Sequence, residues 1–221
     1  MDIIKVSKAG LTLKMRNEVG ELLRLGGVIV YPTDTAYALG GIFDSKIVVK
    51  KILAIKKRKD NKFTLIASSE YQVEKFFSLN AIAKKLAKKY WPGRLSLVVS
   101  KKYAVRVPDN TIARKLARLA GKPLIATSAN MHGGETPYSI KEIVESFSPS
   151  PARPRRTPSP AGGEGNLPLS SLSLDGRGVG VRVATPDIIL DAGTLKKRKT
   201  STIVEVSGNK IKVIREGAIK I

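Results

Sequence analysis

Three short polar clusters contain the residue types that could bind a phosphorylated ligand. They lie at residues 31–35 (Tyr-Pro-Thr-Asp-Thr), 56–58 (Lys-Lys-Arg) and 127–130 (Thr-Ser-Ala-Asn). Each cluster follows an apolar run or closes a predicted helix, which is where a sheet protein presents groups to a ligand. Lysine and arginine supply fixed positive charge, and the hydroxyl and amide groups supply hydrogen bonds. The combination favours a polyanion such as a nucleoside triphosphate.

The amino-acid composition excludes several kinds of catalytic and metal-binding site. The chain of 221 residues has no cysteine and a single histidine, His132. Disulfides, thiol nucleophiles and zinc sites built from cysteine or paired histidines are therefore excluded. Any metal ion would be a hard, oxygen-bound one such as Mg²⁺. The sequence has no apolar run of about 18 residues and no signal-peptide pattern, so we expect a cytoplasmic protein that does not engage a membrane.

The strong positive charge has two interpretations. A net charge of +22 suits nucleic acid, an anionic metabolite or an anionic surface. Lysines spread over a predicted helix, such as Lys84, Lys85, Lys88 and Lys89, more often form a solvated face. Charge alone therefore does not establish an RNA-binding role.

The elements that must position the polar clusters alternate along the chain. Apolar residues at helical spacing predict helices over residues 14–25, 48–57, 70–77, 81–90, 112–120 and 140–147. Extended apolar patterns predict strands over residues 28–31, 63–67, 95–100, 105–108, 123–127, 188–191, 201–206 and 210–215, the last two as a hairpin. Because proline cannot continue a central strand, Pro32 should place Thr33, Asp34 and Thr35 at the rim of the sheet. The alternation predicts an α/β sheet with at least partly parallel pairing.

Residues 149–185 differ in kind from the rest of the chain. They contain five arginines and no lysine, whereas the remainder contains 26 lysines and nine arginines. This reversal of the ratio of lysine to arginine suggests an inserted segment that derives from a G/C-rich repeat element. Because the segment has few periodic apolar residues, it should form a disordered surface loop. The alternative is an arginine-rich RNA-binding arm. If the segment is a surface loop, deleting it should leave folding and activity nearly unchanged.

A series of short motifs carries a resemblance to a known family. The motifs lie, in order, at residues 26–35, 37–40, 56–58, 91–93, 106–108, 128–130, 191–193, 201–204 and 215–218. In this order and spacing the chain resembles the YrdC-like family of threonylcarbamoyl-AMP synthases over nearly all of its length outside residues 149–185. The resemblance implies a single domain over residues 1–221, with a twisted mixed sheet flanked by helices and a basic concave cavity.

The resemblance also implies a reaction. Family members join L-threonine, bicarbonate or CO₂, and ATP into threonylcarbamoyl-AMP and release pyrophosphate. The product serves the threonylcarbamoyladenosine modification of tRNA, which a separate threonylcarbamoyl transferase complex installs. No covalent enzyme intermediate is needed, so no nucleophilic residue is expected. ATP would be a substrate, accompanied by Mg²⁺.

Site residues follow from the resemblance position by position. Those expected to contact the nucleotide are Lys56, Arg58, Asn61, Ser128, Asn130 and Arg215, with Lys56 and Arg58 in an electrostatic role. Those expected to hold threonine are Thr35, Arg106 and Ser201. Asp34 would orient a donor or assist Mg²⁺. Each assignment has a plainer alternative: Ser128 and Asn130 could cap a turn, and the arginines could be surface charges.

Some residues depart from the family pattern. The sequence Tyr-Ala-Leu-Gly at residues 37–40 replaces Tyr-Gly-Leu-Gly, and the strand at residues 63–67 lacks a histidine found in some members. Both features resemble the YciO paralogues. The alternative function is therefore a YciO-like protein that binds double-stranded RNA or tRNA without robust synthase activity. Those paralogues tend to lose the Lys-x-Arg and Ser-x-Asn signatures that this chain keeps, which favours the enzyme. The extra C-terminal domain of longer family members is not expected, because the chain stops at Ile221.

Overall fold

The computed structural model describes residues 2–7, 10–131, 133–147 and 185–221. His132 and the insert predicted over residues 149–185, apart from Thr185, lie outside these ranges. The helices of the described part are α1 (Leu13–Arg24), α2 (Lys46–Lys56), α3 (Glu70–Phe76), α4 (Ala81–Tyr90), α5 (Thr111–Leu119) and α6 (Ile140–Phe147). The strands are β1 (Asp2–Lys5), β2 (Ile29–Pro32), β3 (Tyr37–Gly40), β4 (Phe63–Ile66), β5 (Leu95–Val98), β6 (Tyr103–Arg106), β7 (Leu124–Ser128), β8 (Ile188–Asp191), β9 (Thr202–Ser207) and β10 (Lys210–Arg215).

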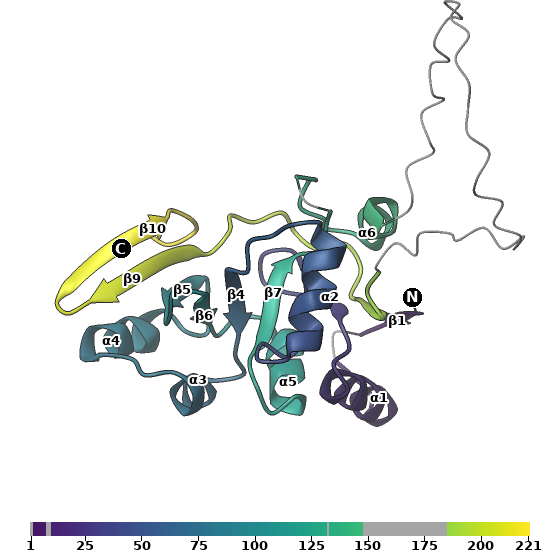
Figure 1. The fold of residues 1–221 in the computed structure, drawn as a ribbon, viewed down its shortest axis with the longest axis horizontal. Coiled ribbons are helices and arrows are strands. Elements are labelled where there is room, and N and C mark those ends of the chain that lie inside the picture. The colour runs from purple at the N-terminus through teal and green to yellow at the C-terminus, as the bar shows by residue number, and fades with distance from the viewer. Residues whose placement is uncertain (1, 8–9, 132, 148–184) are drawn as a thin grey trace, which may run out of the picture.

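The described strands form one mixed, twisted sheet. Their order is β1-β8-β2-β3-β7-β4-β6-β5-β9-β10. The pairs β1/β8, β2/β8, β4/β6 and β5/β9 are parallel, and the remaining pairs are antiparallel. Figure 1 shows β1 at one end of the molecule and the β9–β10 hairpin at the other, with the two termini at opposite ends. The predicted mixed α/β sheet is confirmed.

Local sequence explains where the helices begin. Polar side chains cap the amino-terminal ends of five helices and accept a hydrogen bond from a backbone N–H three residues later: Thr12, Ser45, Ser69, Asn80 and Asn110. Such caps satisfy backbone donors that have no partner within the helix. Helix α2 ends where Lys57 adopts a left-handed conformation with φ 49°. The left-handed conformation of Lys57 turns the chain from the end of α2 toward β4.

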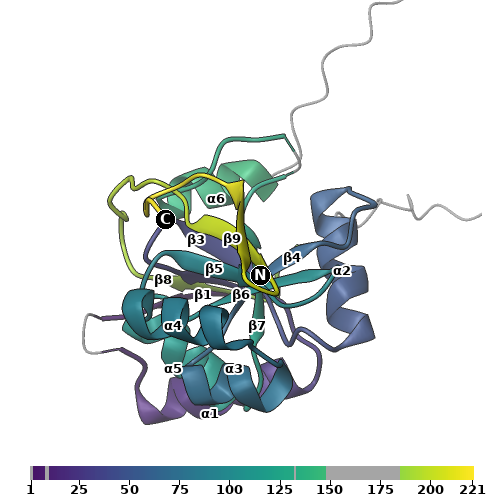
Figure 2. The same ribbon diagram turned by 90° about the vertical axis from the view of Figure 1, so that its left-hand side faces the viewer.

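The helices cover the sheet unevenly. One core cluster joins α2, α3 and α6 to the sheet through Ile52, Val73 and Ile143, and α4 packs on β5 and β9. On the other face, α1 and α5 pack over β2, β3, β7 and β8 through Leu23 and Leu116. In Figure 2, α1, α3, α4 and α5 lie in the lower part of the view, where the twist of the sheet brings helices of its two faces near one another. None of the described helices lies on this second face over β5, β6 and β9.

All six predicted helices are confirmed, with ends that differ by one or two residues. Two strands were missed. β1 contains Asp2 and Lys5, and β3 is a four-residue Tyr-Ala-Leu-Gly segment, so neither shows the alternating β-branched pattern that predicts a strand. The piece predicted at residues 105–108 is instead β6, two residues earlier, and it lies inside the sheet between β4 and β5.

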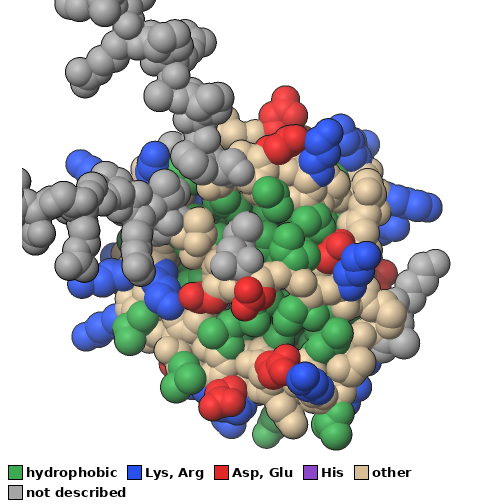
Figure 3. Space-filling model, turned by 90° about the vertical axis from the view of Figure 1, so that its right-hand side faces the viewer, with side chains coloured by type: hydrophobic (Ala, Val, Ile, Leu, Met, Phe, Trp, Pro, Cys, Tyr) green, Lys and Arg blue, Asp and Glu red, His purple; other side chains and the backbone are tan. Residues whose placement is uncertain are grey.

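None of the described helices has the length and apolar character needed to cross a membrane. The face at the β1 end of the molecule carries apolar side chains at its centre, with both basic and acidic side chains around them (Figure 3). The positive charge of the chain is therefore not concentrated as a uniform basic surface on this face.

Candidate functional site

A cavity of about 670 Å³ lies against the part of the sheet that none of the described helices covers. This volume is in the range of small-molecule binding sites. Strand alternation points Thr64, Ala104, Arg106 and Ile203 into it, while Leu65, Val105 and Val204 point to the core on the opposite face. Among the described lining residues, seven are basic and one is acidic: Arg58, Lys62, Lys101, Lys102, Arg106, Arg198, Arg215 and Glu205.

The loop between β2 and β3 supplies one wall of the cavity. Thr33 closes this loop: its hydroxyl donates to the carbonyl of Ala36 (2.7 Å) and accepts from the backbone N–H groups of Thr35 and Ala36 (both 3.2 Å). The neighbouring strands β2 and β3 pair antiparallel through Pro32 and Tyr37. The hairpin therefore fixes Thr35 at the cavity, at the rim position that Pro32 predicted.

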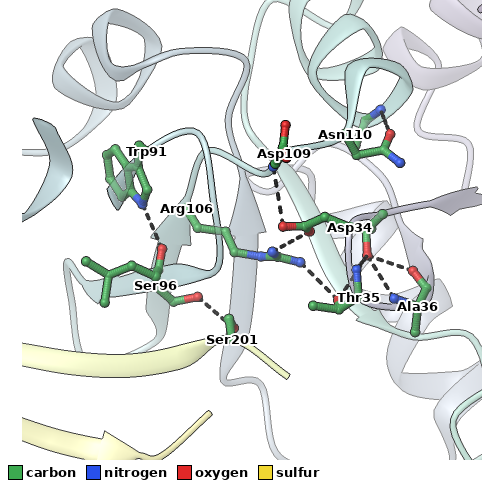
Figure 4. A network of polar contacts seen from close by, with 12 residues as sticks. Asp34, Thr35, Ala36, Trp91, Ser96, Arg106, Asp109, Asn110 and Ser201 are labelled. Carbon is green, nitrogen blue, oxygen red and sulfur yellow. Dashed lines mark hydrogen bonds and ion pairs between the residues drawn. The ribbon is translucent and has the colours of Figure 1, made fainter. Parts of the chain in front are cut away.

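Arg106, at the end of β6, joins this loop (Figure 4). Its Nη1 donates to Asp34 Oδ1 at 2.5 Å, and its Nη2 donates to Thr35 Oγ1 at 3.3 Å. Both members of the ion pair are buried, with 5% and 1% of their side chains exposed. The other carboxylate oxygen of Asp34 accepts from the backbone N–H of Asp109 (3.3 Å). Asp34 therefore orients the guanidinium and offsets its charge.

Ser201 and Arg215 form the facing wall. The guanidinium of Arg215 donates to the Ser201 carbonyl from Nε (3.2 Å) and from Nη2 (2.8 Å), and Nη2 also donates to Ser201 Oγ at 3.1 Å. Beneath them, the buried Ser96 hydroxyl donates to Ser201 Oγ at 3.0 Å. Arg215 belongs to an exposed strand, but partial burial of its guanidinium, together with the nearby charge of Arg106, lowers its pKa below the usual value. The two arginines therefore share one electropositive region.

The return of the chain after β10 fixes this wall. The N–H of Ala218 donates to the Thr200 carbonyl (2.9 Å), and Thr202 Oγ1 donates to the carbonyl of Ile219 (2.6 Å). A Cβ atom on Gly217 would lie 2.4 Å from the Thr200 oxygen. Glycine at this position is therefore required for the close approach of the two segments.

Lys56 lies behind the opposite end of the cavity. The side chain is buried, and its Nζ donates to the carbonyls of Ser128 (2.9 Å) and Asn130 (2.6 Å) and to Asn130 Oδ1 (2.5 Å). The hydroxyl of Ser128 also donates to Asn130 Oδ1, at 2.7 Å. Burial, followed by the charge of Arg58, lowers the pKa of Lys56 to about 8. Lys56 thus holds the loop after β7 in place.

Arg58 lies over the ring of Phe63, with Cζ 4.7 Å from the ring centroid. Its Nη2 donates to the carbonyl of Lys62 at 2.8 Å. Stacking and this hydrogen bond hold the guanidinium at the cavity while Nε is buried without a partner. Arg58 is therefore a positioned cation, and its Nη1 group donates no hydrogen bond within the described residues.

The structure brings six of the nine predicted residues to one cavity: Thr35, Arg58, Arg106, Ser128, Ser201 and Arg215. Lys56 and Asn130 do not line it, because their polar atoms face each other behind Ser128. Asn61 is exposed and lies outside the lining. The plain alternative of a surface ion pair is wrong for Arg106, which is buried and paired with Asp34.

Several residues of the site were missed by sequence reasoning. Tyr37 lines the cavity, and its hydroxyl donates to the Gly193 carbonyl (2.7 Å) and accepts from the Ala192 N–H (2.9 Å), which fixes the segment after β8. Ser96 supports Ser201 from within β5. The only feature of the sequence that could have indicated Ser96 is its position as a lone serine within the apolar segment Leu-Ser-Leu-Val.

The Sua5/YciO/YrdC family model, described as telomere recombination, matches residues 21–151, more than half of the chain. The chain belongs to this family. A Methanocaldococcus jannaschii relative, provisionally named threonylcarbamoyl-AMP synthase, is 28% identical over 99% of this chain and 94% of its own length. The threonylcarbamoyl-AMP synthase of Pyrococcus abyssi is 34% identical over 66% of this chain and 47% of that protein.

Two solved structures of the Sua5/YciO/YrdC family share the fold of this chain. The crystal structure of P. abyssi Sua5 complexed with L-threonine has a TM-score of 0.74 and 25% identity, covering 98% of this chain and 58% of that chain. Escherichia coli YciO has a TM-score of 0.71 and 24% identity, covering 98% of this chain and 96% of that one. The chain therefore spans a little over half the length of the Sua5 chain and nearly all of the YciO chain.

Proposed function

We propose that the protein is a threonylcarbamoyl-AMP synthase that joins L-threonine, bicarbonate or CO₂, and ATP and releases pyrophosphate for tRNA modification. The observation that carries the proposal is the convergence of Thr35, Arg106 and Ser201 with Arg58, Ser128 and Arg215 on one cavity. The likeness to a Sua5 structure that contains L-threonine supports the same ligand for this chain.

The cavity suggests two subsites. Thr35, Arg106 and Ser201 would hold threonine, because a guanidinium fits a carboxylate and hydroxyl groups can bind the remaining polar atoms. Arg58, Ser128 and Arg215 would contact the nucleotide, with charge-assisted hydrogen bonds to its phosphate oxygens. Lys56 and Asn130 would act on the nucleotide indirectly, by fixing the Ser128 loop.

The proposed chemistry needs positioning and charge more than a nucleophile. The amine nitrogen of threonine attacks the carbon of CO₂ and loses a proton, which gives a carbamate. A carbamate oxygen then attacks the α-phosphorus of ATP, the bond to the β-phosphate oxygen breaks, and pyrophosphate leaves. The arginines of the cavity offset the negative charge that builds on the phosphates.

Mg²⁺ would fit this site only if the phosphates of ATP supplied part of its coordination. Among the described residues there is no group of three or more His, Cys, Asp or Glu side chains that could hold a metal ion. The carboxylate of Asp34 is committed to Arg106. Since Mg²⁺ in nucleotide sites usually keeps several waters and binds substrate phosphates, the chain need supply few ligands. The ion would offset charge on the phosphates.

The proposal is tested by measuring pyrophosphate and AMP-containing product with purified protein and ATP. Product should form only when L-threonine and bicarbonate are both present. Arg58→Ala should raise the KM for ATP, whereas Arg106→Ala should raise the KM for threonine, because each removes the principal cation of one subsite. Pyrophosphate release that is independent of threonine would reject the assignment.

The YciO-like alternative makes a different prediction in the same assay. Its support here is the likeness to E. coli YciO, an uncharacterized protein that is 30% identical over 60% of this chain and shares its fold. A non-catalytic RNA-binding protein would release no pyrophosphate and would bind double-stranded RNA with an affinity that falls steeply with salt and is insensitive to ATP.

A further inference from the structure

Ser96 is a polar side chain enclosed within the sheet. Strand β5 lies between β6 and β9, and Ser96 is 0% exposed. Its neighbours Leu95 and Leu97 pack on α4, so strand alternation directs Ser96 to the cavity side of the sheet. Ser96 is not among the cavity-lining residues. It can therefore influence a ligand only through a residue above it.

The residue above it is Ser201. The Ser96 hydroxyl donates to Ser201 Oγ at 3.0 Å, and Arg215 Nη2 donates to the same oxygen at 3.1 Å (Figure 4 shows the serine pair). A serine oxygen has two lone pairs and one hydrogen. Both lone pairs are therefore used by donors, and the hydroxyl hydrogen of Ser201 is the group left to interact. No acceptor for it occurs among the described residues.

We infer that Ser96 is a positioning residue that fixes the Ser201 hydroxyl as a hydrogen-bond donor to an oxygen atom of the bound amino acid. The inference rests on the proposed function. A free serine hydroxyl can either donate a hydrogen bond to an oxygen or accept one from an ammonium group. The contact with Ser96 decides which of these two roles Ser201 has. With both lone pairs occupied, Ser201 can only donate, and it selects a carboxylate or hydroxyl oxygen over the amine.

A matched pair of substitutions tests the role of the buried hydroxyl. Ser96→Thr keeps the hydroxyl group. Ser96→Val introduces a side chain of nearly the same shape as threonine but without the hydroxyl group. We expect Ser96→Val to raise the KM for L-threonine by about three- to tenfold, the range for loss of one neutral hydrogen bond, while the KM for ATP changes little. Ser96→Thr should recover most of the threonine affinity. Equal KM values for the two variants would overturn the inference.

A double-mutant cycle tests whether Ser96 acts through Ser201. In a Ser201→Ala background the oxygen that Ser96 contacts is absent, so Ser96→Val should change the KM for L-threonine by less than about twofold. Residues that act through one another give such non-additive effects. The same fold-increase in both backgrounds would show that Ser96 acts independently of Ser201, which would also overturn the inference.

A third measurement separates this inference from the proposed function. If calorimetry shows that the wild-type protein binds no L-threonine, the proposed function fails. Ligand-free crystal structures of wild type and Ser96→Val then test the positioning role. We expect the Ser201 side chain to hold one rotamer in the wild type and to leave it in the variant. An unchanged Ser201 rotamer in Ser96→Val would overturn the inference.

Discussion

Arg106, assigned to the amino-acid subsite, and Arg215, assigned to the nucleotide subsite, are near one another but differ in how their charge is offset. Arg106 is neutralised by the buried carboxylate of Asp34, whereas the hydrogen bonds of Arg215 go to the uncharged oxygens of Ser201. One net positive charge therefore remains near Ser201. This charge suits an anionic group of a ligand, such as a carboxylate or a phosphate.

The pair between Asp34 and Arg106 should be important for stability. Removing one partner of a buried pair leaves an uncompensated charge, so we expect Asp34→Ala to lower the free energy of unfolding by about 3–5 kcal/mol. Asp44→Ala is the control, because Asp44 pairs with Lys122 at 2.6 Å on the surface and exposed pairs contribute about 1 kcal/mol or less. Urea denaturation compares the two variants. Similar losses would contradict a structural role specific to Asp34.

The lowered pKa of Lys56 predicts a pH dependence of stability. The folded-state pKa is about 8, against 10.5 for a free lysine. Between these two pKa values the unfolded state binds more protons than the folded state. The contribution of Lys56 to the free energy of unfolding therefore rises with pH across this range, by up to about 3 kcal/mol. Below pH 8 this contribution is constant. The free energy of unfolding of wild type, measured relative to Lys56→Met by urea titration, should therefore rise from pH 8 to 10.5.

Lys56→Arg is the matched control for this prediction, because arginine keeps its proton throughout this range. Wild type should show the same rise with pH relative to Lys56→Arg, although the absolute difference in stability will differ. Parallel stability curves for all three proteins would contradict the assigned titration of Lys56.

At the scale of elements, the amino-acid wall depends on β5 and β9 being neighbours. β9 pairs in parallel with β5 through Leu95 and Thr202, and the segment after β10 closes over residues 200–202. Residues 149–185 separate the last strands, β9 and β10, from most of the sheet in the sequence. In the structure both strands are paired in the sheet, and Ser201 lies at the cavity.

Gly217→Ala should disturb this wall. The added Cβ would lie 2.4 Å from the Thr200 oxygen and 2.6 Å from the Ser201 carbonyl carbon, so the two segments must separate. We expect a loss of roughly 1–3 kcal/mol in stability and a higher KM for threonine than for wild type, with little change for ATP. Denaturation and steady-state kinetics measure the two effects.

Gly20→Ala provides a control for this glycine substitution. Gly20 lies inside α1, and its Cβ would meet only the end of the Arg24 side chain at 3.4 Å. Alanine in a helix interior should stabilise the protein by about 0.5–1 kcal/mol. A similar response of the two variants would contradict the close-approach argument at Gly217.

For the whole molecule, the placement of charge is more informative than its total. The chain carries +22, yet the face at the β1 end mixes acidic and basic side chains (Figure 3). The cavity, in contrast, has seven basic side chains and only Glu205 as an acid among its described lining residues. The basic residues of the cavity would therefore attract anionic substrates into the site.

The insert predicted over residues 149–185 gives a prediction at this scale. A chain in which a short Gly-Ser linker replaces the segment should keep the stability and pyrophosphate release of the full chain, because loop-closure cost changes by only about 0.6 kcal/mol per doubling of length. Thermal unfolding and the threonine-dependent assay compare the two proteins. A large loss in either would contradict the surface-loop interpretation.

The sequence by itself determined the type of most elements and indicated six of the residues that line the cavity. Helix positions follow from local spacing and caps such as Ser45 and Asn110, which depend on neighbours within a few residues. Thr35, Arg58 and Ser128 could be placed for the same reason, since each follows a strand or helix end that local patterns mark. β3 escaped prediction because its Tyr-Ala-Leu-Gly sequence is extended only through pairing with β2 and β7.

Only the tertiary structure decided which groups face the ligand and which support it. Lys56 and Arg58 are two residues apart, yet Lys56 turns behind the Ser128 loop and Arg58 lies at the cavity. Ser96 supports Ser201 across 105 positions of sequence. Hydrogen-bond partners are chosen by which strands become neighbours, and that choice depends on long-range packing that no local pattern of residues specifies.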